Sequence, residues 1–212
     1  MDLAQLREDY MKGALERDTL APEPTEQLNL WLEQAVEAQV PEPNAMVLST
    51  VDAEGQPWQR TVLLKGIENK RLLFFTNLES NKARHIEAND RVSLLFLWLP
   101  LERQVIVTGR AELLTRRRVL QYFASRPFGS KLGAWASKQS SVITSRKLLE
   151  MKWDEMKRKF AKGEVPLPSF WGGYAIAPDT VEFWQGRPSR LHDRFLYRAQ
   201  PDATWTTERL SP

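Results

Sequence analysis

Residues 91–114 read RVSLLFLWLPLERQVIVTGRAELL, and this stretch decides the class of fold. Apolar and β-branched residues dominate residues 91–99 and 103–114, which we expect to be strands. Gly109 interrupts the second segment, and a glycine within a strand often marks a bulge. The longest apolar run, residues 94–101, includes Pro100 and is far shorter than the ~20 residues that span a bilayer. The stretch therefore predicts part of a folded sheet.

The segments on either side of this stretch extend the same pattern. Alternating apolar residues predict further strands over residues 45–52, 58–65, 71–77, 173–177, 180–185, 193–199 and 204–209. Helical spacing of apolar residues predicts helices over about 3–17, 25–39, 80–88, 115–125 and 144–161. We therefore expect a mainly β protein with helical insertions (α+β), built as an antiparallel barrel in a single domain over residues 1–212.

Composition restricts the chemistry that this chain can perform. Its 212 residues are 42% hydrophobic and 27% charged, as in ordinary globular proteins. The chain has no cysteine and two histidines, which excludes disulfides and thiolate nucleophiles and makes a histidine-rich metal site unexpected, although carboxylate metal sites remain open. The first 18 residues mix charged and apolar side chains, so we expect no signal peptide and a cytoplasmic protein. Difficult chemistry would then require an organic cofactor.

The charge balance argues against nucleic acid as a partner. The net charge is only +3, although the calculated pI is about 9.2. The compact basic runs, residues 116–118 and 157–159, lie in helix-like segments beside apolar residues and do not predict one basic face. We expect neither nucleic acid nor membrane as a partner, and basic residues elsewhere are available for small phosphorylated ligands.

Residues 189–197, SRLHDRFLY, carry the densest group of polar side chains and one of the two histidines. Strand alternation would place Arg190, His192 and Arg194 on one cationic face, with Asp193 on the opposite face. A solvated strand end explains the same residues without any function. The segment alone leaves both interpretations open.

Two other segments have the composition of an anion site. In RTVLLK, Arg60 and Lys65 lie at the two ends of a predicted strand and tend to opposite faces. Ser80, Asn81 and Lys82 lie where a helix is predicted to begin, a place that favours anions. A strand with charged ends and a capped surface helix are the alternative interpretations.

A third segment, QYFASRPFGS, contains Tyr122, Arg126 and Ser130 at intervals of four residues. Tyr122 and Arg126 share a helical face if the predicted helix reaches Arg126, and Ser130 lies in the turn that follows. All three side chains can donate hydrogen bonds to a phosphate, and Arg126 adds a positive charge. A packed tyrosine and a surface arginine would account for them equally well.

Taken in order, these segments resemble the pyridoxine 5′-phosphate oxidase family. RTVLLK, FFTNLESNKA, LERQV, SRPFGS, SKQSS, VPLPSFWGG and EFWQG with RLHDRFLY carry the resemblance, which runs from REDYMKG to the terminal ERLSP. It implies a split β-barrel homodimer with two FMN, each contacted by both chains. It further implies oxidation of pyridoxine 5′-phosphate and pyridoxamine 5′-phosphate to pyridoxal 5′-phosphate by hydride transfer from the substituent at ring position 4, with oxygen reduced to hydrogen peroxide.

The resemblance also assigns residues to roles. The residues that it places against FMN are Arg60, Thr61, Val62, Leu63, Leu64, Lys65, Phe75, Thr76, Asn81, Lys82, Gln104, Gln139, Ser140, Trp184 and Arg194. The residues that it places against the substrate are Arg7, Glu8, Asp9, Tyr10, Lys65, Tyr122, Arg126, Ser130, Arg190, Leu191 and His192. Arg190 and His192 are the expected catalytic residues that cover the substrate ring, and residues 1–20 are expected to form a mobile segment that closes over it.

Two departures and two alternative functions accompany this assignment. Asn81 stands where the family often has a second cation beside Lys82, and Phe128-Gly129 replaces a more polar pair before Ser130. A split-barrel flavin enzyme with another substrate is one alternative, and a flavin or pyridoxal phosphate binding protein without turnover is the other. Peroxide production with pyridoxine 5′-phosphate would distinguish them.

Overall fold

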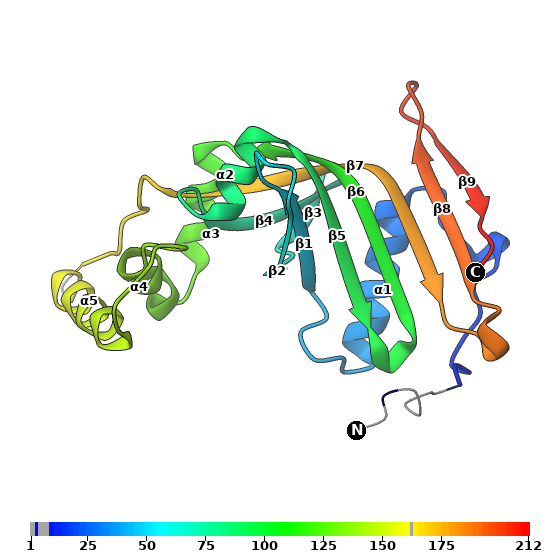
Figure 1. Cartoon of the computed structure of the whole chain (residues 1–212), viewed down its shortest axis with the longest axis horizontal. Helices are drawn as coiled ribbons and strands as arrows, with labels where there is room; N and C mark the ends of the chain where they lie inside the picture. Colours follow the sequence, from blue (N-terminus) through cyan, green and yellow to red (C-terminus); the bar gives the residue numbers. More distant parts are fainter. Residues whose placement is uncertain (1–2, 4–8, 162) are drawn as a thin grey trace.

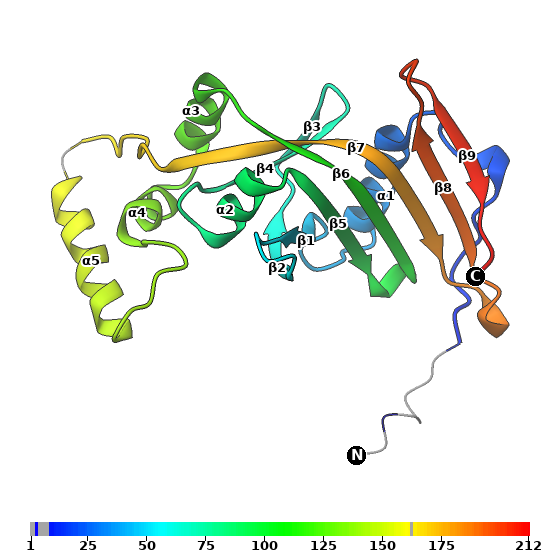
Figure 2. The ribbon, with the colours of Figure 1, turned by 45° about the horizontal axis from the view of Figure 1, so that its top comes forward.

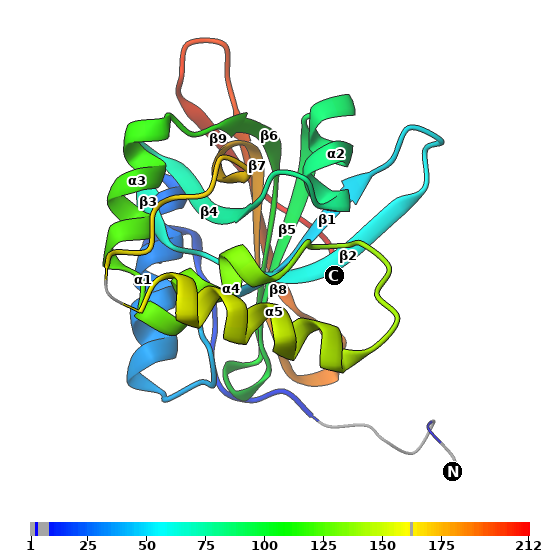
Figure 3. The ribbon, with the colours of Figure 1, turned by 90° about the vertical axis from the view of Figure 1, so that its left-hand side faces the viewer.

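A single antiparallel sheet organises the chain in the computed structural model, which describes residues 3, 9–161 and 163–212. Within these residues the sheet has nine strands and curls into a half-barrel, as Figures 1 and 3 show. The strands are β1 (Ala45–Val51), β2 (Pro57–Leu63), β3 (Gly66–Glu68), β4 (Arg71–Asn77), β5 (Arg91–Trp98), β6 (Arg103–Leu113), β7 (Trp171–Gln185), β8 (Asp193–Ala199) and β9 (Trp205–Arg209). The predicted antiparallel barrel with helical insertions is confirmed.

Strand β7 connects the two ends of the molecule. One of its edges pairs with β6 along almost the whole strand. The other edge pairs first with β4, over residues 171–176, and then with β8, over residues 180–185. The sequence pattern predicts two shorter strands here, but β7 is continuous, with a bulge opposite Gly109. A Cβ at Gly109 would lie 2.1 Å from the Ala177 carbonyl oxygen, so only glycine allows this close approach.

Five helices of the described chain cover different parts of the sheet. They are α1 (Pro24–Glu37), α2 (Asn81–Ala88), α3 (Arg116–Ser125), α4 (Phe128–Ala136) and α5 (Arg146–Lys159). Helix α1 lies against one face of the sheet and buries Leu28, Trp31 and Ala35 in the main core, where the Trp31 and Phe183 rings are 5.1 Å apart. Helices α3, α4 and α5 gather at the end of the molecule opposite the β8–β9 hairpin (Figure 2). A smaller core, built around Phe123 and Leu132, joins this helical end to the start of β7.

Two local predictions about helices were wrong. The predicted helix over residues 3–17 is absent from residues 9–16, which have no regular secondary structure, and Arg17–Thr19 form a short 3-10 turn. Helix α4 was not predicted, because Gly129 and Gly133 lower its intrinsic helix propensity. Packing compensates for this propensity: Leu132 is buried, and Trp153 of α5 lies against both glycines. Ser130 therefore belongs to a helix and not to a turn.

Among the described residues, no helix combines the length and the apolar character that a membrane crossing requires.

Candidate active site

A cavity of about 460 Å³ opens where the ends of β2 and β4 meet α2, α3 and α4. The residues of the predicted FMN and substrate sets that line it are Thr61, Val62, Leu63, Lys65, Phe75, Thr76, Lys82, Tyr122, Arg126, Ser130 and Gln139. Lys65, Lys82 and Arg126 supply positive charge, and no carboxylate belongs to the described lining. The cavity therefore has the electrostatic character of an anion site.

An aromatic stack forms one wall of the cavity. The rings of Phe75 and Tyr122 are stacked with their centroids 3.9 Å apart, and Trp171 lies 5.6 Å from Phe75 on a nearly parallel plane. Gly173 pairs with Phe75 across β7 and β4, and a Cβ at Gly173 would lie 2.7 Å from that ring. The stack holds Tyr122 at the cavity wall. The sequence analysis missed Trp171, although its place in VPLPSFWGG beside two glycines was an available signal.

Arg126 is a half-buried cation with one fully buried donor atom. Its Nη1 atom is buried and has no hydrogen-bond partner among the described residues. The guanidinium lies 4.7 Å from the Trp171 ring, and burial lowers the pKa of Arg126 from its ordinary value. An unpartnered buried donor costs about 1–3 kcal/mol, and more when it is charged. A bound anion would remove this cost.

Lys82 is buried, and its amine has hydrogen-bond partners. The Nζ atom donates hydrogen bonds to Gln139 Oε1 at 2.8 Å, Thr76 Oγ1 at 3.1 Å and Ser80 Oγ at 3.2 Å. Burial, followed by the positive charge of Arg60, lowers the pKa of Lys82 to about 8. The amine is therefore held in place at the start of α2 with no carboxylate partner.

The other residues predicted around this phosphate site do not line the cavity. Arg60 donates hydrogen bonds to the Leu48 carbonyl and Thr50 Oγ1 from the middle of β2. Leu64 is buried beyond the end of that strand. Ser140 Oγ accepts a hydrogen bond of 3.2 Å from the Asn81 amide, so the loop that carries Gln139 is tied to the start of α2.

A second group of predicted residues lies at the far end of β7. Gln104 pairs with Trp184, and Trp184 pairs with Arg194, so three adjacent strands place these residues in one row. Glu182 accepts a hydrogen bond of 2.8 Å from Arg194 Nε and raises the pKa of that arginine. Glu182 was not predicted, because pairing with Arg194 depends on the strand register.

Aromatic contacts extend this row toward the N-terminal segment. The Trp184 and His192 rings are 4.6 Å apart, and Tyr10 packs 5.7 Å from each of them. Asp9 is exposed, whereas Arg7 and Glu8 lie outside the described residues. Burial and then the charge of Arg190 lower the pKa of His192, against the opposing effect of Asp193.

The strand alternation expected for Arg190, His192 and Arg194 does not hold, because only Arg194 lies in a strand. Residues Pro188–Arg190 form a 3-10 turn in which Ser189 and Arg190 have left-handed φ angles of 57° and 62°. Strand β8 begins only at Asp193, and Leu191 is 70% exposed. The expected alternation holds over residues 193–195, where Asp193 and Phe195 are buried and Arg194 is half-buried.

The two groups of predicted residues do not meet within one chain. Trp171 borders the cavity and Trp184 belongs to the distant row, so 13 residues of β7 separate them. A strand rises about 3.3 Å per residue, which corresponds to roughly 40 Å along β7. Figures 1 and 2 show α3 and α4 at one end of the molecule and the β7–β8 connection at the other. A site that uses both groups requires a second chain.

Family models match almost the whole chain. Residues 32–160 match the model described as pyridoxamine 5′-phosphate oxidase. Residues 171–212 match the model described as pyridoxine 5′-phosphate oxidase C-terminal dimerisation region.

Named relatives and solved structures give the same result. A pyridoxine/pyridoxamine 5′-phosphate oxidase from Rippkaea orientalis is 58% identical to the chain, and the match covers 100% of both proteins. One from Proteus mirabilis is 56% identical, and the match covers 100% of this chain and 97% of the relative. PhzG from Burkholderia lata superposes with a TM-score of 0.88 at 27% identity, over 94% of this chain and 98% of its own. An FMN-binding protein from Nostoc punctiforme, at 17% identity, superposes with a TM-score of 0.72 over 92% of this chain and 100% of its own, which shows the shared fold.

Proposed function

Because the chain belongs to the pyridoxamine 5′-phosphate oxidase family, we propose that its cationic cavity binds the phosphates of FMN and of a pyridine substrate. The chain oxidises pyridoxine 5′-phosphate and pyridoxamine 5′-phosphate to pyridoxal 5′-phosphate, the activity named for relatives that are 53–58% identical over their full length. This reaction belongs to vitamin B6 metabolism. Oxygen as the electron acceptor and a cytoplasmic location are parts of the proposal.

One observation carries the substrate assignment: the unpartnered buried Nη1 of Arg126. Lys65, Tyr122 and Ser130 line the same cavity and can donate further hydrogen bonds to one phosphate. Charge-assisted hydrogen bonds from arginine to phosphate are among the strongest in proteins. A substrate phosphate would therefore supply the partner that Arg126 lacks and would anchor the pyridine ring near the aromatic wall.

The remaining part of the cavity fits the phosphate of FMN. Lys82 has a buried amine without a carboxylate partner, and the Thr76 and Gln139 side chains bond to that amine. When bound, FMN would accept the two electrons that oxidation of the carbon attached to ring position 4 of the substrate releases. The chain itself positions the reacting groups and stabilises the charge that develops.

A homodimer would complete this site with residues of the second chain. The C-terminal residues match a dimerisation region. In the proposed arrangement one chain contributes the cavity, and its partner contributes the row Gln104, Trp184 and Arg194 together with Arg190 and His192. The ion pair with Glu182 fixes the position of Arg194, and the positive charge of Arg194 would stabilise negative charge that develops beside it when FMN is bound.

His192 is suited to orienting the substrate. The Arg187 amide donates a hydrogen bond of 3.1 Å to His192 Nδ1, so the neutral ring carries its proton on Nε2. Its lowered pKa favours this neutral form near pH 7. His192 can therefore donate a hydrogen bond to the substrate from Nε2 without removing a proton from it.

FMN affinity is expected to fall as the pH rises above about 8. Lys82 has an ordinary pKa of 10.5 and a pKa of about 8 in the folded protein without ligand, so the folded protein loses this charge first. Between about pH 8 and 10.5 Lys82 is protonated more often in the unfolded chain than in the folded protein. The contribution of Lys82 to the free energy of unfolding therefore rises with pH over this range. Phosphate binding favours charged Lys82 and therefore requires proton uptake, which weakens binding about tenfold per pH unit.

Titration of the apoprotein with FMN, followed by flavin fluorescence at several pH values, measures this dependence. Lys82→Arg, which stays charged, is the matched control and should give a flat profile over the same range. Equal slopes for the parent and for Lys82→Arg would show that another group causes the dependence.

The oxidase assignment is tested by anaerobic mixing of the FMN-loaded protein with each phosphorylated vitamer. Bleaching of the oxidised flavin is expected with both vitamers, followed by peroxide formation when oxygen is admitted. Bleaching without peroxide would indicate a different electron acceptor. A flavin that stays oxidised with both vitamers would favour a non-enzymatic binding protein or an enzyme with another substrate.

A further inference from the structure

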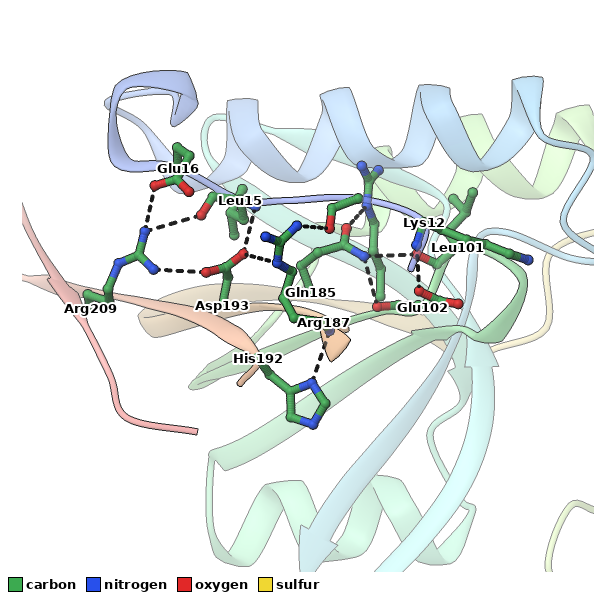
Figure 4. Close-up of polar contacts among 12 residues, drawn as sticks. Lys12, Leu15, Glu16, Leu101, Glu102, Gln185, Arg187, His192, Asp193 and Arg209 are labelled. Carbon is green, nitrogen blue, oxygen red and sulfur yellow. Dashed lines mark hydrogen bonds and ion pairs between the residues drawn. The ribbon is translucent and has the colours of Figure 1, made fainter. Parts of the chain in front are cut away.

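The buried carboxylate of Asp193 joins the N-terminal residues near Leu15 to the β7–β8 connection and to β9. Its Oδ2 accepts a hydrogen bond of 3.1 Å from the Leu15 amide and lies 3.5 Å from Arg187 Nε. Its Oδ1 accepts a hydrogen bond of 2.8 Å from Arg209 Nη1 in β9. Figure 4 shows Asp193 at the centre of these contacts. Only 7% of the residue is exposed, so the carboxylate depends on these partners for its stability.

The partners of Asp193 also bind the N-terminal segment, which we define as residues 10–16. Arg187 Nη1 donates a hydrogen bond of 2.8 Å to the Gly13 carbonyl. Arg209 Nη2 donates to the Glu16 carboxylate at 2.8 Å and to the Leu15 carbonyl at 3.4 Å. The segment is therefore held along its length by two arginines that Asp193 itself orients.

A second carboxylate fixes the segment closer to Tyr10. Glu102 Oε2 accepts a hydrogen bond of 2.9 Å from the Lys12 amide (Figure 4). Tyr10 then packs on Gly186, where an added Cβ would lie 2.8 Å from its ring. These contacts place the tyrosine beside Trp184 and His192.

Asp193 also acts on His192 through Arg187. The same arginine that pairs with Asp193 donates its backbone amide to His192 Nδ1. Asp193 faces away from Arg194, so it does not share the face on which the predicted substrate and flavin contacts lie. Its effect on those contacts must therefore pass through the residues that it holds.

We propose that Asp193 is a positioning residue, which fixes the N-terminal segment and the His192 ring and thereby sets the affinity for the pyridine substrate. The proposal rests on the proposed function for its kinetic consequence. Its structural part, the hold on the N-terminal segment, is measurable without substrate.

Asp193→Asn tests this role in the full-length, FMN-loaded dimer. The substitution keeps the side-chain shape but removes the negative charge. It also replaces one carboxylate oxygen, which accepts hydrogen bonds, with an NH₂ group, which would face the donors of Leu15, Arg187 or Arg209. We expect hydrogen exchange of the Leu15 amide to become at least about tenfold faster. We expect KM for pyridoxine 5′-phosphate to rise about tenfold while kcat changes less than about twofold, because substrate binding is affected and hydride transfer is not.

A cycle with Tyr10→Ala separates positioning from general destabilisation. If Asp193 acts through the segment that carries Tyr10, Asp193→Asn should raise KM much less in the Tyr10→Ala background. Glu208→Gln is the matched control. The exposed Glu208 carboxylate of β9 lies 3.4 Å from Arg198 Nε of β8, so this ion pair joins the same two strands as the pair between Asp193 and Arg209. This variant should change neither the Leu15 exchange rate nor KM.

Three outcomes would overturn the proposal: unchanged Leu15 exchange in Asp193→Asn, unchanged KM, or a KM effect of equal size with and without Tyr10. If Asp193→Asn does not fold, Arg187→Gln, which cuts one of the same links, should show the faster exchange and the raised KM. A parent protein without oxidase activity would refute the proposed function, while the exchange measurement would still test the hold on the segment.

Discussion

Arg126→Met is expected to lower kcat/KM for pyridoxine 5′-phosphate by about a hundredfold or more, without lowering the melting temperature. The loss follows because removing one partner of a buried charged contact typically costs about 2–5 kcal/mol of binding. The stability is retained because Nη1 of Arg126 is buried without a partner, and methionine can pack on the Trp171 ring that the guanidinium now covers. Steady-state kinetics and thermal unfolding of the apoprotein measure the two effects separately.

Arg117→Met is the matched control, because Arg117 is exposed on α3, the helix that ends just before Arg126, and its loss changes the net charge equally. It should leave kcat/KM within about twofold of the parent. Pyridoxine without its phosphate provides a second control, because Arg126→Met should not reduce whatever activity the parent has toward it. A similar kcat/KM for the two arginine variants would mean that Arg126 does not bind the substrate phosphate.

A heterodimer of two inactive variants is expected to recover about half of the parent activity, since one of its two sites would carry neither substitution. The first chain carries Arg126→Met, which affects the cavity, and the second carries Arg190→Ala, which affects the distant group. Because β7 separates these groups by roughly 40 Å, each site must combine one group from each chain. Heterodimers purified through two different tags allow the activity per FMN to be measured.

A heterodimer with both substitutions in the cavity group provides the control. Arg126→Met in one chain and Lys65→Met in the other should leave every site with one lesion, and no activity should return. Recovery in this control, or no recovery with Arg126→Met and Arg190→Ala, would contradict a site shared between chains.

Local periodicity was sufficient for most of the elements in this fold. Strand β4 and strand β8 have the predicted bounds, and α1, α2, α3 and α5 lie within two residues of theirs. Helices α1, α2 and α3 bury one face, so the apolar pattern of each helix reflects its own environment. Gly109 also marked the bulge correctly, because a side chain there would meet the opposite backbone.

Local patterns failed where a distant segment decides the conformation. Helix α4 contains two glycines and forms because Leu132 is buried and Trp153 packs over those glycines. The N-terminal segment has a helical pattern, yet it forms no helix, because Asp193 and Glu102 accept hydrogen bonds from the amides of Leu15 and Lys12. In α4 and in the N-terminal segment the competing contacts come from residues far away in the chain. Arg190, which strand alternation would have placed on one face with His192 and Arg194, instead lies in a left-handed turn before β8.

The sequence by itself determined the sheet-rich class of fold, the family resemblance and the residue types of the site, since these depend on neighbouring positions and on ordered motifs. Only the tertiary structure decided which residues meet. Strand register aligns Gln104, Trp184 and Arg194 across three strands, and packing leaves Nη1 of Arg126 buried with no hydrogen-bond partner among the described residues. The physical reason is that alternation fixes the face of a side chain within one strand, whereas its neighbours on that face depend on pairing with segments far away in the sequence.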